Sequence, residues 1–148
     1  MKDLIIYTDG AYSSARNQGG VGLVFIQDDK LVKAYGKMFK NVTNNKMELA
    51  AVIIALQSAY KTGGINKITI YSDSQYVIGC ATKGWKRKKN INLWKKYDQI
   101  KEKLDQEKIE VKFKWVHGHN GDKFNEMADQ LAVDASQEID LNPDVKCL

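Results

Sequence analysis

The sequence contains little cysteine and proline, and it has no long hydrophobic run. Its two cysteines, Cys80 and Cys147, have neither the spacing of metal ligands nor the number needed for a disulfide framework, although a bridge between them stays open. No apolar run approaches the roughly 18 residues of a membrane helix, and the N-terminal "MKDLIIYTDG" lacks the features of a signal peptide. These absences exclude a disulfide-rich secreted protein and a helical membrane protein. We expect a cytoplasmic protein without a membrane partner.

Size and composition predict one domain with a hydrophobic core. The chain has 148 residues, of which 43% are hydrophobic and 28% charged, as in globular proteins. It contains no internal repeat and no linker-like segment, and its only proline, Pro143, lies near the C-terminus. We therefore expect a single domain over residues 1–136, followed by a poorly packed tail over residues 137–148.

The net charge of +5 comes from one short segment. The stretch "KGWKRKKNINLWKK" is rich in lysine and has no acid, and without its basic residues the acidic residues of the chain would outnumber the basic ones. A local basic cluster with two tryptophans, Trp85 and Trp94, indicates a polyanionic partner, with nucleic acid as the first candidate. A solvated helix face or loop is the alternative interpretation of the same run.

Hydrophobic periodicity and turn residues predict a mixed α/β fold. An Ala-rich run without glycine or proline predicts a long helix that ends at Gly63 and Gly64. Strands and helices that alternate after a three-stranded meander indicate a mixed sheet with helices on its faces. The expected strands are 3–8, 19–27, 30–39, 66–72 and 109–116, and the expected helices are 43–60, 73–81, 92–106 and 123–136.

Four carboxylates occupy positions at strand ends or on packed helix faces, where a charged residue usually has a structural or functional role. Asp9, in "YTDGA", is expected at the end of the first strand, and Asp73 at the end of the fourth, where ligands of such sheets gather. Glu48 shares the packed face of the Ala-rich helix, and Asp129 borders the apolar stripe of the last helix.

Each of these acids also has a local explanation. Asp9 and the glycine after it could form a hairpin turn, and Asp73 could cap the helix that follows it. Glu48 could complete a capping box with Asn45, and Asp129 could be a solvated acid on a helix surface. Taken together the four weaken these explanations, because neighbouring strands and a covering helix would bring all of them to one place.

Converging carboxylates repel each other and need a cation to neutralise them. Hard oxygen ligands select Mg²⁺, which keeps several waters and takes substrate phosphate as a further ligand. Two such ions stabilise both the attacking and the leaving oxygen of a phosphoryl displacement. The four acids therefore predict a site for two Mg²⁺ ions that acts on a phosphodiester.

The chain resembles type 1 ribonuclease H. The matching pieces are "YTDGA", "GG-x-G" after the first strand, "TNNKMELAA", "YSDSQYV" and "WVHGHNGDKFNEMAD", and together they extend from residue 5 to about residue 135. The resemblance implies a ribonuclease H fold, with a five-stranded mixed sheet in the order 3-2-1-4-5 and helices on both sides. It also implies an endonuclease that cuts the RNA strand of RNA–DNA hybrids and leaves 5′-phosphate and 3′-hydroxyl ends.

The resemblance assigns roles to particular residues. Asp9, Glu48, Asp73 and Asp129 would bind two Mg²⁺ ions, for which Mn²⁺ could substitute, and His119 would help proton transfer or product release. The enzyme would act as a monomer and would read the 2′-hydroxyl of the RNA strand. The residues expected to contact the hybrid are Gly10, Thr43, Asn44, Asn45, Gln75, Trp85 and Lys86.

Two segments depart from the family pattern. The residues "SSARNQ" replace a Gly/Pro-rich turn, so the contacts made by that turn in relatives are not carried over. The basic stretch is too short for the extra helix and loop of many bacterial relatives, and we expect a shortened basic protrusion that still grips the DNA strand.

Three other functions compete with hybrid cleavage. A non-catalytic hybrid-binding module would be expected to lack one or more of the acids, and all four are present. A resolvase or transposase core shares acids at similar strand ends, because a fold alone does not define a function. A phosphoaspartate phosphatase would need a nucleophilic aspartate two residues before its general acid, where this chain has Tyr7.

Overall fold

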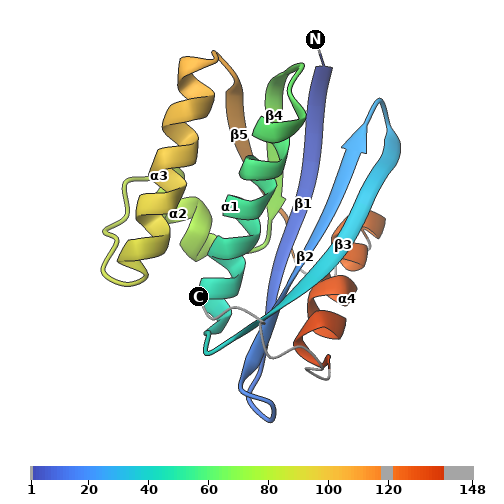
Figure 1. Cartoon of the computed structure of the whole chain (residues 1–148), viewed down its shortest axis with the longest axis vertical. Coiled ribbons are helices and arrows are strands. Elements are labelled where there is room, and N and C mark those ends of the chain that lie inside the picture. Colours follow the sequence, from blue (N-terminus) through green and yellow to red (C-terminus); the bar gives the residue numbers. More distant parts are fainter. Residues whose placement is uncertain (1, 118–121, 139–148) are drawn as a thin grey trace.

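A twisted mixed sheet forms the centre of the molecule (Figure 1). The computed structural model describes residues 2–117 and 122–138. Within them, five strands have the order β3-β2-β1-β4-β5, as the resemblance predicted. The first three strands pair antiparallel, whereas β4 and β5 run parallel to β1. The strands are β1 (Lys2–Ser13), β2 (Gln18–Gln27), β3 (Lys30–Lys40), β4 (Ile65–Ser72) and β5 (Glu110–Trp115).

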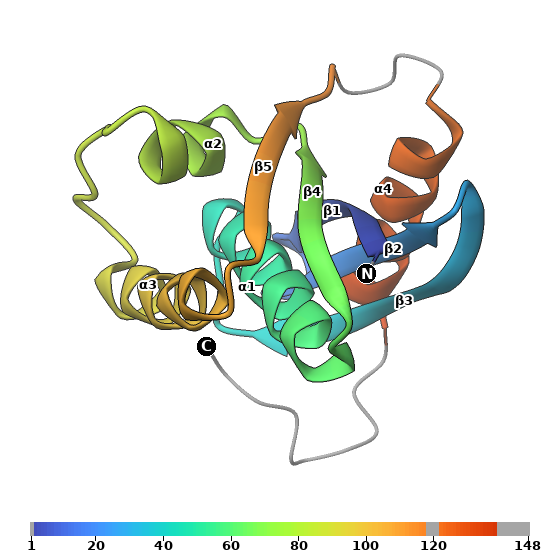
Figure 2. The same ribbon diagram turned by 90° about the horizontal axis from the view of Figure 1, so that it is seen from above.

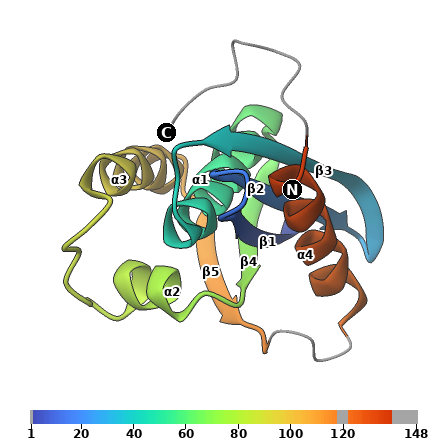
Figure 3. The ribbon, with the colours of Figure 1, turned by 90° about the horizontal axis from the view of Figure 1, so that it is seen from below.

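Helices cover both faces of this sheet. Figure 2 shows α1 and α3 on one side of the strands and α4 on the other, and Figure 3 shows the same division from the opposite end. Helix α1 packs against β1, β2 and β4, and α4 packs against β1, β2 and β3. No helix in the described ranges is long and apolar enough to cross a membrane. The helices are α1 (Asn44–Thr62), α2 (Gln75–Thr82), α3 (Ile91–Gln106) and α4 (Lys123–Ser136).

The two faces of the sheet have different packing. The larger hydrophobic cluster lies between the sheet and α1 and α3. Under α4 the cluster is small, and its buried members include Tyr7 and Ala128. Helix α4 lies directly on the backbone of β2, because a Cβ atom at Gly22 would overlap the carbonyl oxygen of Ala128. Gly20 and Gly22 of "GGVG" therefore let α4 approach the sheet closely.

The first strand is longer than predicted, which changes the place of Asp9. Strand β1 continues to Ser13 instead of ending near residue 8, so Asp9 lies inside the strand opposite Gly22 of β2. The interpretation of Asp9 and the glycine after it as a hairpin turn is therefore wrong. The predicted strand was too short because "DGAYS" lacks hydrophobic alternation, and its extended backbone depends on pairing with β2.

Candidate active site

Four carboxylates from four separate elements line one open pocket of about 360 Å³. They are Asp9 of β1, Glu48 of α1, Asp73 just after β4, and Asp129 of α4. One ligand oxygen each from Asp9, Glu48 and Asp73 lies within 4.8 Å of the other two, which is close enough to share a metal ion. The structure thus brings the four acids predicted from the sequence to one place.

The pocket forms where β1 and β4 separate. The two strands pair from Lys2 to Tyr7 of β1, after which β1 continues with β2 alone. Strand β4 ends at Ser72, and the chain then turns into α2. Asp9 and Asp73 follow the last paired residues of the two strands, so their side chains can face each other across the opening. Ligands of open α/β sheets bind outside the carboxyl ends of strands, and the pocket lies at the carboxyl end of β4.

Glu48 reaches the pocket because α1 begins very close to β1. A Cβ atom at Gly10 would overlap the backbone nitrogen of Glu48, so only glycine permits this approach. The Gly10 N–H donates a hydrogen bond to the Glu48 carboxylate and also contacts Oδ1 of Asp9 at 2.9 Å. The backbone of residue 10 thereby holds two of the four carboxylates in place.

Helix capping does not explain the acids. Thr43 caps α1, because its side chain accepts a hydrogen bond from the Lys46 N–H at 3.2 Å. Ser74 caps α2 in the same way, with the Val77 N–H at 3.1 Å. The interpretations of Asp73 as a cap and of Asn45 as part of a capping box are therefore wrong, and the Asp73 carboxylate is left to face the pocket.

The electrostatics of the pocket favour a bound cation. Burial raises the pKa of Asp9 from its usual acidic range to about 7, and the charge of Asp73 adds to this effect. The pKa of Glu48 is also raised, first by burial and then by its hydrogen bond and charge interaction with Asp9. The described residues that line the pocket include no lysine or arginine. Hard oxygen donors without a protein cation fit a divalent metal ion.

The other predicted site residues fall into three groups. Gly10, Asn44, Asn45 and Gln75 line the same pocket as the acids. Thr43 is exposed beside them at the start of α1. Trp85 and Lys86 are exposed in the segment after α2 and do not line the pocket. His119 lies outside the described residues.

The hydrogen bond between Tyr7 and Asp122 is a contact that the sequence pattern did not indicate. Oδ1 of Asp122 accepts from the first N–H groups of α4, and Oδ2 accepts from the Tyr7 hydroxyl at 3.2 Å. Burial and the Asp122 charge raise the pKa of Tyr7, so the hydroxyl keeps its proton as the donor. This bond ties the start of α4, which carries Asp129, to the strand that carries Asp9.

Replacing Tyr7 by Phe is expected to lower the free energy of unfolding by about 1 kcal/mol. The variant keeps the ring that stacks on Tyr71 at 4.5 Å and loses only the hydroxyl. Urea denaturation checks the effect, with Tyr71→Phe as the control, because the Tyr71 hydroxyl has no hydrogen-bond partner among the described residues. Equal losses in both variants would show that the Asp122 contact contributes nothing.

Comparison with known proteins places this fold and pocket in a family. The RNase H family model matches residues 1–137. The chain is 38% identical over 152 residues to a ribonuclease H of Trichodesmium erythraeum, which covers 97% of this chain and 94% of that protein. It is similar to RNase H1 of Halobacterium salinarum, with 29% identity, a TM-score of 0.74, and coverage of 90% of this chain and 96% of that one. It also shares the fold of LC11-RNase H1, solved in complex with an RNA/DNA hybrid, with 22% identity, a TM-score of 0.74, and coverage of 89% and 95%. The chain belongs to the ribonuclease H family.

Proposed function

We propose that this ribonuclease H hydrolyses the RNA strand of RNA–DNA hybrids as an endonuclease, using two Mg²⁺ ions and leaving 5′-phosphate and 3′-hydroxyl ends. The convergence of four carboxylates in one pocket of a ribonuclease H chain carries this proposal. The structural neighbour LC11-RNase H1, with its bound RNA/DNA hybrid, supports the choice of substrate. The protein is proposed to act as a monomer in the cytoplasm.

Asp9, Glu48, Asp73 and Asp129 are the proposed ligands of the metal ions, and Mn²⁺ is expected to substitute for Mg²⁺. Metal ions held there would supply Lewis-acid stabilisation of the attacking water and of the leaving 3′ oxygen of the RNA. A carboxylate oxygen of Asp9 lies within 4.8 Å of oxygens of Glu48 and Asp73, so Asp9 is proposed to hold metal together with both of them. The Gly10 N–H donates to the Glu48 carboxylate and orients it toward Asp9. His119 stays a predicted proton-transfer residue.

Polar residues at the rim of the pocket are proposed to read the hybrid. The side-chain amides of Asn44, Asn45 and Gln75 offer both donors and acceptors beside the carboxylates, and Thr43 and Gly10 lie next to them. Such groups can recognise the 2′-hydroxyl that marks an RNA strand. Trp85 and Lys86 are proposed to contact the DNA strand at a distance from the pocket. Contacts of lysine with phosphates make affinity fall as the salt concentration rises.

Cleavage of a labelled hybrid by the purified protein tests the proposal. We expect cuts in the RNA strand with Mg²⁺ or Mn²⁺, no cuts after chelation, and no cuts in duplex DNA or a four-way junction. End-labelling of the products, followed by phosphatase treatment, identifies the 5′-phosphate. Hybrid binding without cleavage would identify a binding module instead, and preferential cutting of the junction would identify a resolvase.

A further inference from the structure

We propose that Arg87 is a positioning residue for the hybrid: it fixes the connecting segment, residues 83–90 between α2 and α3, and does not bind phosphate itself. The inference rests on the proposed function, since it concerns how the basic segment is presented to a nucleic acid. The segment contains no helix or strand. Backbone hydrogen bonds hold its start, where the Lys83 and Trp85 N–H groups donate to the Gly79 carbonyl. Side-chain contacts hold the residues that follow.

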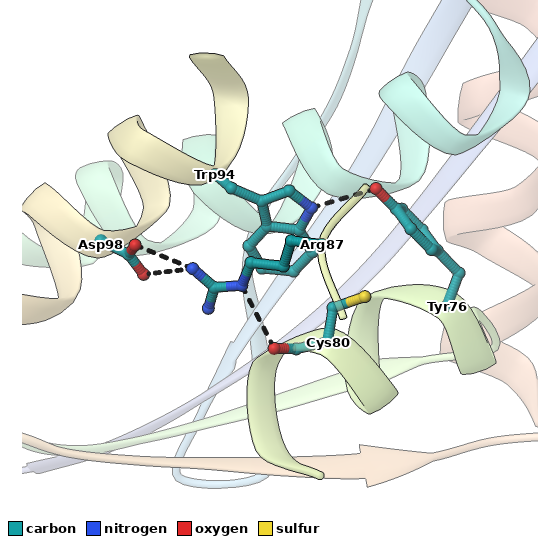
Figure 4. Close-up of polar contacts among 5 residues, drawn as sticks. All are labelled: Tyr76, Cys80, Arg87, Trp94 and Asp98. Carbon is teal, nitrogen blue, oxygen red and sulfur yellow. Dashed lines mark hydrogen bonds and ion pairs between the residues drawn. The ribbon is translucent and has the colours of Figure 1, made fainter. Parts of the chain in front are cut away.

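The Arg87 guanidinium is held on several sides (Figure 4). Its Nη1 lies 2.8 Å from both carboxylate oxygens of Asp98 on α3. Its Nε donates to the Cys80 carbonyl, in the last turn of α2, at 3.4 Å. Its Cζ atom lies 4.3 Å from the ring centroid of Trp94, which is buried. The side chain therefore connects the end of α2, the segment and α3, and its charge is already paired.

A second set of contacts ties the end of the segment to the wall of the carboxylate pocket. The Trp94 Nε1–H donates to the Tyr76 hydroxyl at 3.0 Å (Figure 4). The Asn90 side-chain amide donates to the same hydroxyl at 3.0 Å. Tyr76 lies on α2 and also lines the pocket. The segment is thus fixed relative to the pocket through Tyr76 at one point and through Arg87 at another.

The charges of the segment divide into two kinds. Lys86, Lys88 and Lys89 are exposed, and none of the ion pairs found in the described part of the chain includes them. The Arg87 side chain is only 28% exposed and is paired with Asp98. Lysine ammonium groups in water are therefore available to phosphates, whereas Nη1 and Nε of Arg87 already have partners within the protein. Planar stacking and a forked donor set are properties that lysine cannot reproduce.

Replacing Asp98 by Asn separates a positioning role of Arg87 from a phosphate-binding role, because the two roles predict opposite changes in KM for the hybrid. If Arg87 positions the segment, Asp98→Asn raises KM for the hybrid about fivefold with kcat at saturation unchanged, which corresponds to loss of about 1 kcal/mol of the pair. If Arg87 binds phosphate, releasing it from Asp98 lowers KM and overturns the proposal. Asp105→Asn is the matched control, since Asp105 is 60% exposed against 58% for Asp98 and pairs with Lys101 on the same helix.

Arg87→Lys and hydrogen exchange complete the test. We expect Arg87→Lys to raise KM about as much as Asp98→Asn, because lysine keeps the positive charge and lacks the several N–H donors of the guanidinium. A wild-type KM in this variant overturns the proposal. Amide exchange over residues 83–90 is expected to accelerate in Asp98→Asn and not in Asp105→Asn. Hydrogen exchange is measured without a hybrid, so it tests the positioning role alone. The cleavage assay with the wild-type protein tests the proposed function separately. Equal exchange in the two variants overturns the proposal.

Discussion

Asp9→Asn is expected to reduce hydrolysis of the hybrid at least about a thousandfold, which corresponds to about 4 kcal/mol of transition-state stabilisation. The reason is geometric: Asp9 lies between the other acids, and an amide is a poor ligand for Mg²⁺. Hybrid binding should persist, because the proposed nucleic-acid contacts other than Gly10 lie at the start of α1, on α2 and in the connecting segment. Single-turnover cleavage and fluorescence anisotropy measure the two quantities.

The control for this variant is Asp3→Asn. Asp3 lies on the same strand and is exposed, so the substitution removes one negative charge without touching the pocket. It should cleave at the wild-type rate. If Asp9→Asn also cleaved at the wild-type rate, Asp9 would not be a metal ligand. If Asp9→Asn lost binding as well, its effect on the rate would not isolate the metal site.

The metal-free protein is expected to lose stability as the pH rises from about 4 to about 7. Asp9 binds its proton more tightly in the folded state, with a pKa of about 7, than in the unfolded state, with its usual pKa near 4. Because the unfolded state releases this proton first, each increase in pH through that window favours unfolding. The raised pKa of Glu48 acts in the same direction. The loss attributable to Asp9 should be roughly 3 kcal/mol between pH 5 and pH 8.

Comparison with Asp9→Asn isolates this effect from all other titrating groups. In the presence of a chelator, the variant should be more stable than the wild type at pH 8 by about 4 kcal/mol, and the difference should shrink toward pH 4. Saturating Mg²⁺ should stabilise the wild type more at pH 8 than at pH 5, because the ion and the protons compete for the same oxygens. Parallel stability curves for the two proteins would contradict the shared burial of these carboxylates.

Much of the fold could be predicted from periodicity. The last helix was expected over residues 123–136, which are the bounds of α4, and the other elements agree within a few residues apart from the end of β1. The strand order came from the family resemblance. The predicted convergence of the acids followed from strand ends and helix faces, which depend on short-range patterns. The bounds of the elements and the convergence of the acids could therefore be predicted, because they depend on local patterns or on the topology of a known family.

Other features depend on contacts that no local pattern contains. Asp73 and Ser74 are adjacent residues that can both cap a helix, so the sequence does not indicate which of them does. Trp94 was grouped with Trp85 as an aromatic of a basic surface, but it is buried and only Trp85 is exposed. Trp94 packs against Tyr76 of α2, Tyr97 of α3 and the Arg87 guanidinium, and the lysines beside it in the sequence conceal these contacts. Likewise, the pairing of Arg87 with Asp98 depends on the path of the connecting segment.

Helix α4, which packs directly on the backbone of β2, is synthesised after the rest of the described fold. Three of the pocket acids lie in the first half of the chain, whereas Asp129 arrives with the last described helix. Domains fold as their residues leave the ribosome, with the N-terminal part first. A nascent chain that has emerged through β5 still lacks the α4 layer and the fourth carboxylate. Translation products that end before α4 therefore lack the complete pocket of four carboxylates and are expected not to cleave hybrids.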